Sequence, residues 1–174
     1  GIPSFDSDFS LADVYRELSV PVVLFSSREG EAGVSIDLHT VFPDLSLDER
    51  FFGSYNFEEL DRALLAVKEL GAEIILRLGE TPNPVGKRPY LRLPTTPERI
   101  AEIFLRVIAH CNNGFCGGMK LGVKRVEIWQ SPDDGFGFFP AREEYFELYK
   151  TVSAKIKMQF PKIKVGAYSS GGFA

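Results

Sequence analysis

The stretch FEELDRALLAVKELGAEIILRLGE, residues 57–80, indicates a helix followed directly by a strand. Apolar side chains recur at helical spacing in its first part, at Phe57, Leu60, Leu64, Val67 and Leu70. Asn56 with Glu59 three residues later is typical of a helix start, and Gly71 is typical of a helix end. The run EIILRL, residues 73–78, then predicts a buried strand.

The same plan recurs along the chain. Further helices are expected over residues 11–18, from the cap Thr96 to residue 108, and over 142–160, and strands over 20–25, 123–129 and 163–168, with a strand-like patch at 34–41. Strands that alternate with helices imply right-handed crossovers and a parallel sheet. The sequence therefore predicts an α/β fold of parallel βα repeats, in one domain over residues 1–174.

Composition excludes several classes of protein. The 174 residues carry a net charge of -4, which argues against a nucleic-acid or anionic-membrane partner, because such partners need clustered Lys and Arg. No apolar run reaches the roughly 18 residues of a membrane span, and no signal peptide is recognised. Because the chain opens on Gly-Ile-Pro, we expect that sequence preceded it, and the compartment is left open.

The two cysteines lie close together in the sequence, Cys111 five residues before Cys116 and directly after His110. A structural zinc site needs four ligands, and His39 is the one other histidine in the chain. We therefore expect no metal and no cofactor. A local disulfide and two free thiols both remain open for the cysteines.

Four longer stretches carry a resemblance to a known family: SIDLHTVFPDLS (35–46), SYNFEELDRALLAVKELGAEIILRLGE (54–80), VEIWQSPDD (126–134) and REEYFELYKTVSAKIKMQFPKIKVGA (142–167). Together they resemble clan A glycoside hydrolases, and most of all the family 39 β-xylosidase-like proteins. Members of that family are (β/α)8 barrels that cleave glycosides with retention of configuration. The resemblance implies a partial barrel, from about its first helix to its fifth strand.

The resemblance also implies where the active site would lie. In the family the fourth strand ends in Trp-Asn-Glu-Pro, with the Glu as general acid/base, and here Trp129 is followed by Gln130 and Ser131. Retaining hydrolysis needs one carboxylic acid to protonate the leaving oxygen and a second carboxylate to attack the anomeric carbon. Ser131 therefore marks a substituted catalytic position. The family nucleophile belongs to a seventh strand, for which this sequence has no counterpart.

The substitution at Ser131 and the lack of a seventh strand leave three functions open. The first is a catalytically inactive or fragmentary glycosidase-like domain. The second is a carbohydrate-binding or interaction module, in which Trp129, Gln130, Glu80 and His39 contact a xyloside-like saccharide. Against this, Trp129 also suits a core position, Glu80 an ion pair with Arg77, and His39 a structural role. The third is a part of an active retaining glycosidase that further sequence completes.

The predicted sheet also has consequences for assembly. A row of four or five parallel strands that does not close leaves two edges with unpaired backbone groups. It also leaves an inner face uncovered, which we expect to be apolar. The sequence therefore predicts a homo-oligomer that forms through the open sheet edges.

Overall fold

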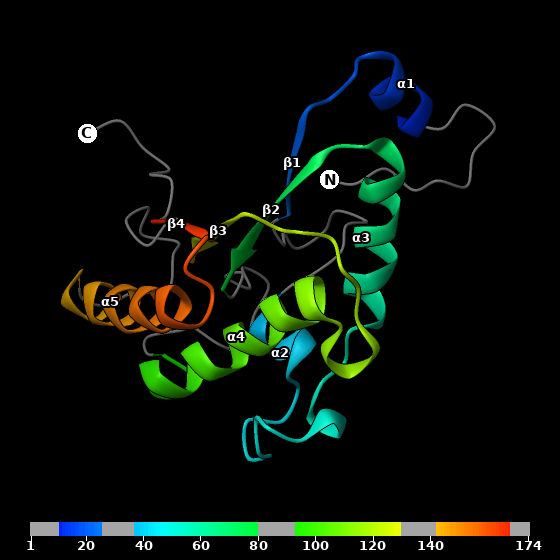
Figure 1. Ribbon diagram of the computed structural model, residues 1–174. Helices are drawn as coiled ribbons and strands as arrows, with labels where there is room; N and C mark the ends of the chain where they lie inside the picture. Colours follow the sequence, from blue (N-terminus) through cyan, green and yellow to red (C-terminus); the bar gives the residue numbers. More distant parts are fainter. Residues whose placement is uncertain (1–10, 26–36, 80–92, 130–141, 168–174) are drawn as a thin grey trace, which may run out of the picture.

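The computed structural model describes residues 11–25, 37–79, 93–129 and 142–167. Helices and strands alternate along the chain as expected (Figure 1). In order they are α1 (Leu11–Glu17), β1 (Val22–Phe25), α2 (Leu38–Val41), the 3-10 turn η1 (Phe52–Ser54), α3 (Glu58–Leu70), β2 (Glu73–Leu78), α4 (Pro97–Asn113), the 3-10 turn η2 (Phe115–Gly117), β3 (Arg125–Ile128), α5 (Arg142–Gln159) and β4 (Lys164–Gly166). No described helix has the length and apolarity needed to span a membrane.

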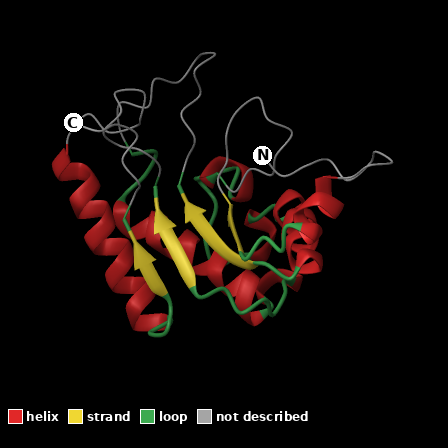
Figure 2. Ribbon diagram, turned by 90° about the horizontal axis from the view of Figure 1, so that it is seen from above, coloured by secondary structure: helices red, strands yellow, loops and turns green. Residues whose placement is uncertain are grey.

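The four strands form one parallel sheet in the order β1-β2-β3-β4 (Figure 2). Each strand therefore lies beside the next strand in the sequence, and a helix connects each pair. Sequential parallel strands with helical crossovers are the pattern of a (β/α) barrel. The α/β class and the partial barrel topology expected from the sequence are confirmed.

One face of the sheet packs against α3, α4 and α5. The side chains of β2 and β3 that point this way are buried, namely Ile74, Leu76, Leu78, Val126 and Ile128, and they join one core with the buried side chains of these helices. Their spacing of two residues is the alternation of a strand with one covered face. The intervening side chains belong to the opposite face, which is the inner face of a barrel.

The inner face carries charge in the part of the sheet that the structure describes. Arg77 lies beside Glu127 in the sheet register, and its Nε and Nη2 atoms donate to Glu127 Oε2 at 3.0 and 2.9 Å. Arg125 Nε lies 3.4 Å from Glu73 Oε1 on the same two strands. The expectation of an apolar inner face is therefore wrong for Glu73, Arg77, Arg125 and Glu127, which form cross-strand ion pairs, whereas Ile75 between them is apolar.

Helix α4 begins as its sequence indicates. Thr96 caps it in an extended conformation and its side chain accepts a hydrogen bond from Arg99 N at 3.4 Å. Pro97 occupies the first helical position, where the missing N–H has no intrahelical acceptor to lose. The helix ends at Gly114, whose φ of 79° is the left-handed conformation that glycine adopts without strain.

Helix α3 starts one residue later than a cap at Asn56 would require. Phe57 is the N-cap residue, and its side chain makes no cap hydrogen bond. The Asn56 side chain still bonds to the start of the helix, because its Oδ1 accepts from Glu58 N at 3.2 Å. The Asn56 backbone N–H donates to Val41 O and so holds the start of α3 beside α2, which a local sequence pattern does not indicate.

The strand-like patch expected over 34–41 is a helix over 38–41. Residues 34–36 lie outside the described residues, and Asp37 forms a single parallel bridge with Gly79. Leu38 N then donates to Gly79 O at 2.8 Å, and α2 begins there. Over the described residues 37–41, one strand pairing is therefore followed directly by a helical turn in place of the expected strand.

Candidate functional site

The carboxyl ends of the parallel strands meet at one edge of the sheet, which is where (β/α) barrels place their binding and catalytic residues. Strand β2 ends at Leu78 and is followed by Gly79, and β3 is followed by Trp129. Trp129 N donates to Leu78 O at 2.7 Å. With the bridge from Asp37 to Gly79, the described part of this edge runs from Asp37 through Gly79 to Trp129.

Trp129 fixes the direction in which the chain leaves β3. Its φ is 69°, a conformation uncommon outside glycine, and its side chain has 0% exposure. Gly79 lies against it, since a β-carbon on Gly79 would be 3.0 Å from Trp129 Cα and 3.3 Å from the indole ring. Unusual backbone conformations of this kind are concentrated at functional sites, where surrounding contacts maintain them.

Two further side chains support this edge. Tyr145, buried on α5, donates its hydroxyl to Ile128 O at 3.1 Å and so ties the end of β3 to the helix behind it. Asp37 is 7% exposed, which makes it the one buried carboxylate among the described residues. No local pattern in the sequence singles out Asp37, because the burial of this aspartate depends on tertiary contacts.

The structure places two of the five predicted site residues. Trp129 lies at the carboxyl edge, and His39 is an exposed residue of α2, two positions after Asp37. Glu80, Gln130 and Ser131 lie outside the described residues, although each follows the edge residues Gly79 or Trp129 within two positions. The saccharide-binding and catalytic-position roles of all five stay predictions. For Trp129, stacking on a sugar ring requires the buried indole to become accessible.

The cysteines and the adjacent histidine have separate surroundings. Both thiols are free, and burial together with the nearby Asp61 charge raises the pKa of Cys111 to about 12. His110 is fully buried, with Nδ1 2.7 Å from Phe115 O and Nε2 2.7 Å from Asp61 Oδ1. Because a carbonyl oxygen only accepts, Nδ1 carries a proton and the ring serves as a link between α3, α4 and η2. Within the described ranges, no group of three His, Cys, Asp or Glu side chains could hold a metal ion.

Of three comparisons with known proteins, the one with solved structures gives a match. No protein-family model matches the sequence, and no curated protein matches it. A solved structure of a glucosidase from Croceicoccus marinus superposes on the chain with a TM-score of 0.76 and 23% sequence identity. The two proteins share a fold.

The similarity covers 95% of this chain and 34% of the glucosidase chain, so the chain spans about a third of the length of that protein. A TM-score of this size over nearly all of the chain supports the arrangement of the four strands and their helices as a whole. The glycosidase-like fold that the sequence resemblance implied is therefore shown, and the family within it is not.

Proposed function

We propose that this chain is a glycoside hydrolase-like domain of the β-xylosidase type, of family 39 in clan A, that does not catalyse hydrolysis. The observation that carries the proposal is the buried Trp129 at the carboxyl edge, packed on Gly79, with Ser131 two positions further along the chain. The likeness to a glucosidase fold supports the assignment of this edge as the site.

The chemistry of Ser131 explains the lack of hydrolysis. A glycosidic oxygen leaves readily when a carboxylic acid protonates it, and such general acid catalysis contributes about 10² to 10⁴ in rate. A serine hydroxyl holds its proton far too tightly at neutral pH to take that part. The domain therefore retains the position of the catalytic acid without its function.

Saccharide binding without turnover is the second candidate, and Asp37 favours it. Sugar hydroxyl groups are recognised by a few well-placed acceptors in a mostly apolar surface. Asp37 is a buried carboxylate residue that is bridged to Gly79, and Gly79 in turn packs against Trp129. Gln130 and Glu80 are the candidates for further hydrogen bonds.

Two assays test the proposal. Incubation with aryl xylosides and aryl glucosides is expected to give no release of the aryl group above buffer, and an enzyme-dependent rate that survives repurification would contradict it. Thermal shift titration with xylose and xylo-oligosaccharides tests binding, because a ligand that binds only the folded state stabilises it by RT ln(1 + [L]/Kd). A saturable shift that Asp37→Asn abolishes and that Asp44→Asn, in an exposed loop, leaves intact would establish the edge as a saccharide site.

A further inference from the structure

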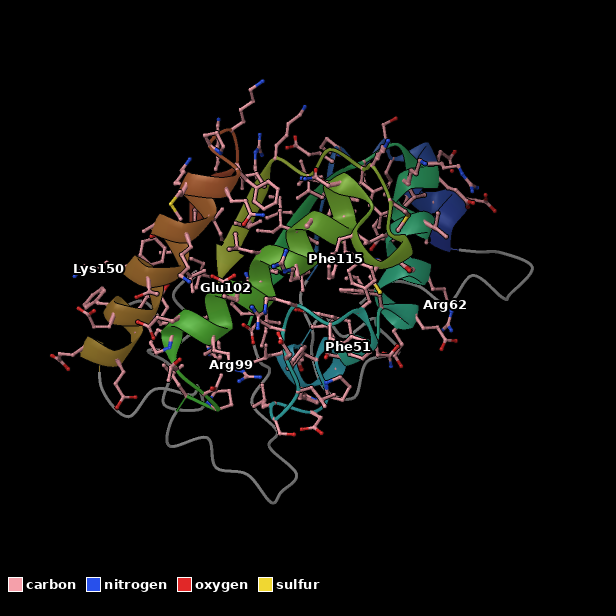
Figure 3. All side chains as sticks on the ribbon, turned by 60° about the horizontal axis from the view of Figure 1, so that its bottom comes forward. Phe51, Arg62, Arg99, Glu102, Phe115 and Lys150 are labelled. Atoms are coloured by element: carbon pink, nitrogen blue, oxygen red, sulfur yellow. The ribbon has the colours of Figure 1, made fainter. Side chains whose placement is uncertain are left out.

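Helix α4 is buried around most of its surface. Between residues 100 and 111 its side chains are buried except at Glu102 and Arg106, and Arg99, directly before this stretch, is also partly exposed. These three residues are three and four positions apart, a spacing that places them in one stripe along a helix. Figure 3 shows Arg99 and Glu102 along α4, with Phe115 toward the far end of the helix. This charged stripe is the part of the helix over 99–111 that a ligand reaches.

Two neighbouring elements contribute charge to this stripe. The loop before α3 approaches on one side, where Arg99 Nη2 donates to Leu47 O and lies 3.7 Å from Glu49 Oε2. Helix α5 approaches on the other side, where Lys155 Nζ donates to Glu102 Oε1 (Figure 3). Each of the two carboxylates thus has a cation close by. A further positive charge on the stripe is left without a carboxylate from these pairs.

Arg106 carries that positive charge. Among the described residues its guanidinium has no ion pair and no hydrogen bond, and its Nε atom is shielded from solvent without an acceptor. The guanidinium carbon lies 5.5 Å from the centre of the Phe115 ring, an attraction that occupies no hydrogen-bond acceptor. The Nε atom of Arg99 lacks an acceptor in the same way. A donor withdrawn from water without an acceptor costs free energy, so both arginines favour an acceptor from outside the chain.

The partly buried hydroxyl of Tyr55 shows that the two arginines act on one place. Burial raises the pKa of Tyr55 above its ordinary value, and the charges of Arg106 and Arg99 oppose this rise while Glu49 and Glu102 add to it. The hydroxyl donates to the backbone carbonyl of Glu49 at 2.7 Å, which fixes it beside the stripe. The two guanidinium groups therefore lie within electrostatic range of a single point next to α4.

We propose that Arg106, assisted by the charge of Arg99, binds the oxyanion group of a small ligand, a phosphate or a carboxylate. The guanidinium fork holds two oxygens of such a group at once, which a lysine does not do. The two residues are about 10 Å apart along the helix axis, a span that two long side chains bridge around one ligand. The site belongs to the side of α4 that faces away from the sheet, so it is independent of saccharide binding at the carboxyl edge.

Inorganic phosphate and glucuronate are the two probes, each titrated into the 174-residue chain at an ionic strength held constant with sodium chloride. A saturable rise in melting temperature is expected, because a ligand that binds only the folded state stabilises it. Constant ionic strength removes the general effect of screening. Glucose, which has the ring of glucuronate without the carboxylate, is the control. A response to phosphate alone assigns a phosphate ligand, a response to glucuronate above that to glucose assigns a carboxylate, and no response to either probe overturns the proposal.

Two arginine variants locate the site. Arg106→Gln is expected to raise the dissociation constant of the responding probe about tenfold or more, because it removes charge-assisted hydrogen bonds. Arg62→Gln changes an arginine of α3 whose side chain is 71% exposed, and this matched control should stay within about twofold. Arg106→Lys keeps the charge without the fork and should fall between the two. Equal dissociation constants for Arg106→Gln and Arg62→Gln would overturn the proposal.

Nuclear magnetic resonance of the unsubstituted chain gives a readout that does not depend on how a variant folds. The Nε–H resonance of Arg106, identified by its loss in Arg106→Lys, should move with the concentration of the probe along the same curve as the melting temperature. The Nε–H resonance of Arg62 should stay in place. A resonance of Arg106 that does not move while the melting temperature rises would mean that the anion binds elsewhere, which overturns the proposal.

Discussion

Gly79 and Trp129 are packed so closely that a β-carbon on Gly79 would lie 3.0 Å from the Cα atom of Trp129. The two residues follow neighbouring strands, and Trp129 N also bonds to the carbonyl of Leu78, directly before the glycine. The position of Trp129 directly after β3 therefore depends on the absence of a side chain at Gly79, directly after β2. Any ligand site at this edge is positioned by that contact.

We expect Gly79→Ala to destabilise the fold by about 1–3 kcal/mol, because the added carbon meets backbone atoms of Trp129 that have little room to move. Gly166→Ala is the matched control at the end of β4, where the nearest atom to the added carbon is 3.5 Å away, and it should change stability by no more than about 0.5 kcal/mol. Urea unfolding of both variants measures the difference. Equal losses of stability in the two variants would show that Trp129 can move to make room for a side chain at position 79.

We expect Glu127→Gln to lower the free energy of unfolding by about 1.5–3 kcal/mol, because Arg77 donates twice to this carboxylate and is only 12% exposed. Glu73→Gln alters a longer and more exposed pair with Arg125, at 3.4 Å, and should lose less than about 1 kcal/mol. Denaturant midpoints give the comparison. A larger loss for Glu73→Gln than for Glu127→Gln would contradict the ranking of the two inner-face pairs.

We expect Asp61→Ala to lower the free energy of unfolding by about 1–3 kcal/mol, because the substitution removes the carboxylate that lies 2.7 Å from Nε2 of the fully buried His110. Glu58→Ala on the same helix removes a carboxylate that is 80% exposed and should stay within about 0.5 kcal/mol. Thermal melting of the two variants provides the measurement. Equal melting temperatures for the two variants would show that the contact between His110 and Asp61 does not stabilise the fold.

We expect the two thiols to differ in reactivity. Burial raises the pKa of Cys111 to about 12, whereas Cys116 is partly exposed, so iodoacetamide should label one thiol in the folded chain and two in urea. Because the thiol ionises near its ordinary pKa of about 8.5 once the chain unfolds, stability should fall as the pH rises above that value toward 12. Labelling counted by mass spectrometry tests the first point, with Cys116→Ser taking up no label while folded. Rapid labelling of both thiols in the folded chain would disprove it.

Much of the fold could be predicted because its elements are encoded over short distances. The apolar run in EIILRL predicts β2, and Thr96 with Pro97 predicts the start of α4. The segment from Leu38 to Val41 could not be predicted in this way, since its apolar residues fit either a short strand or one helical turn. The helix forms where Leu38 N donates to Gly79 O, and these two residues are distant in the sequence.

The sequence by itself determined the α/β class and the order of helices and strands, because periodicity and residue identity are local properties. The tertiary structure alone decided that Trp129 is buried against Gly79, that Asp37 lies at the same edge, and that Arg77 pairs with Glu127 on the inner face. Each of these depends on the register between strands that are separated by a whole helix. Register is set by packing across the sheet, and no local pattern carries it.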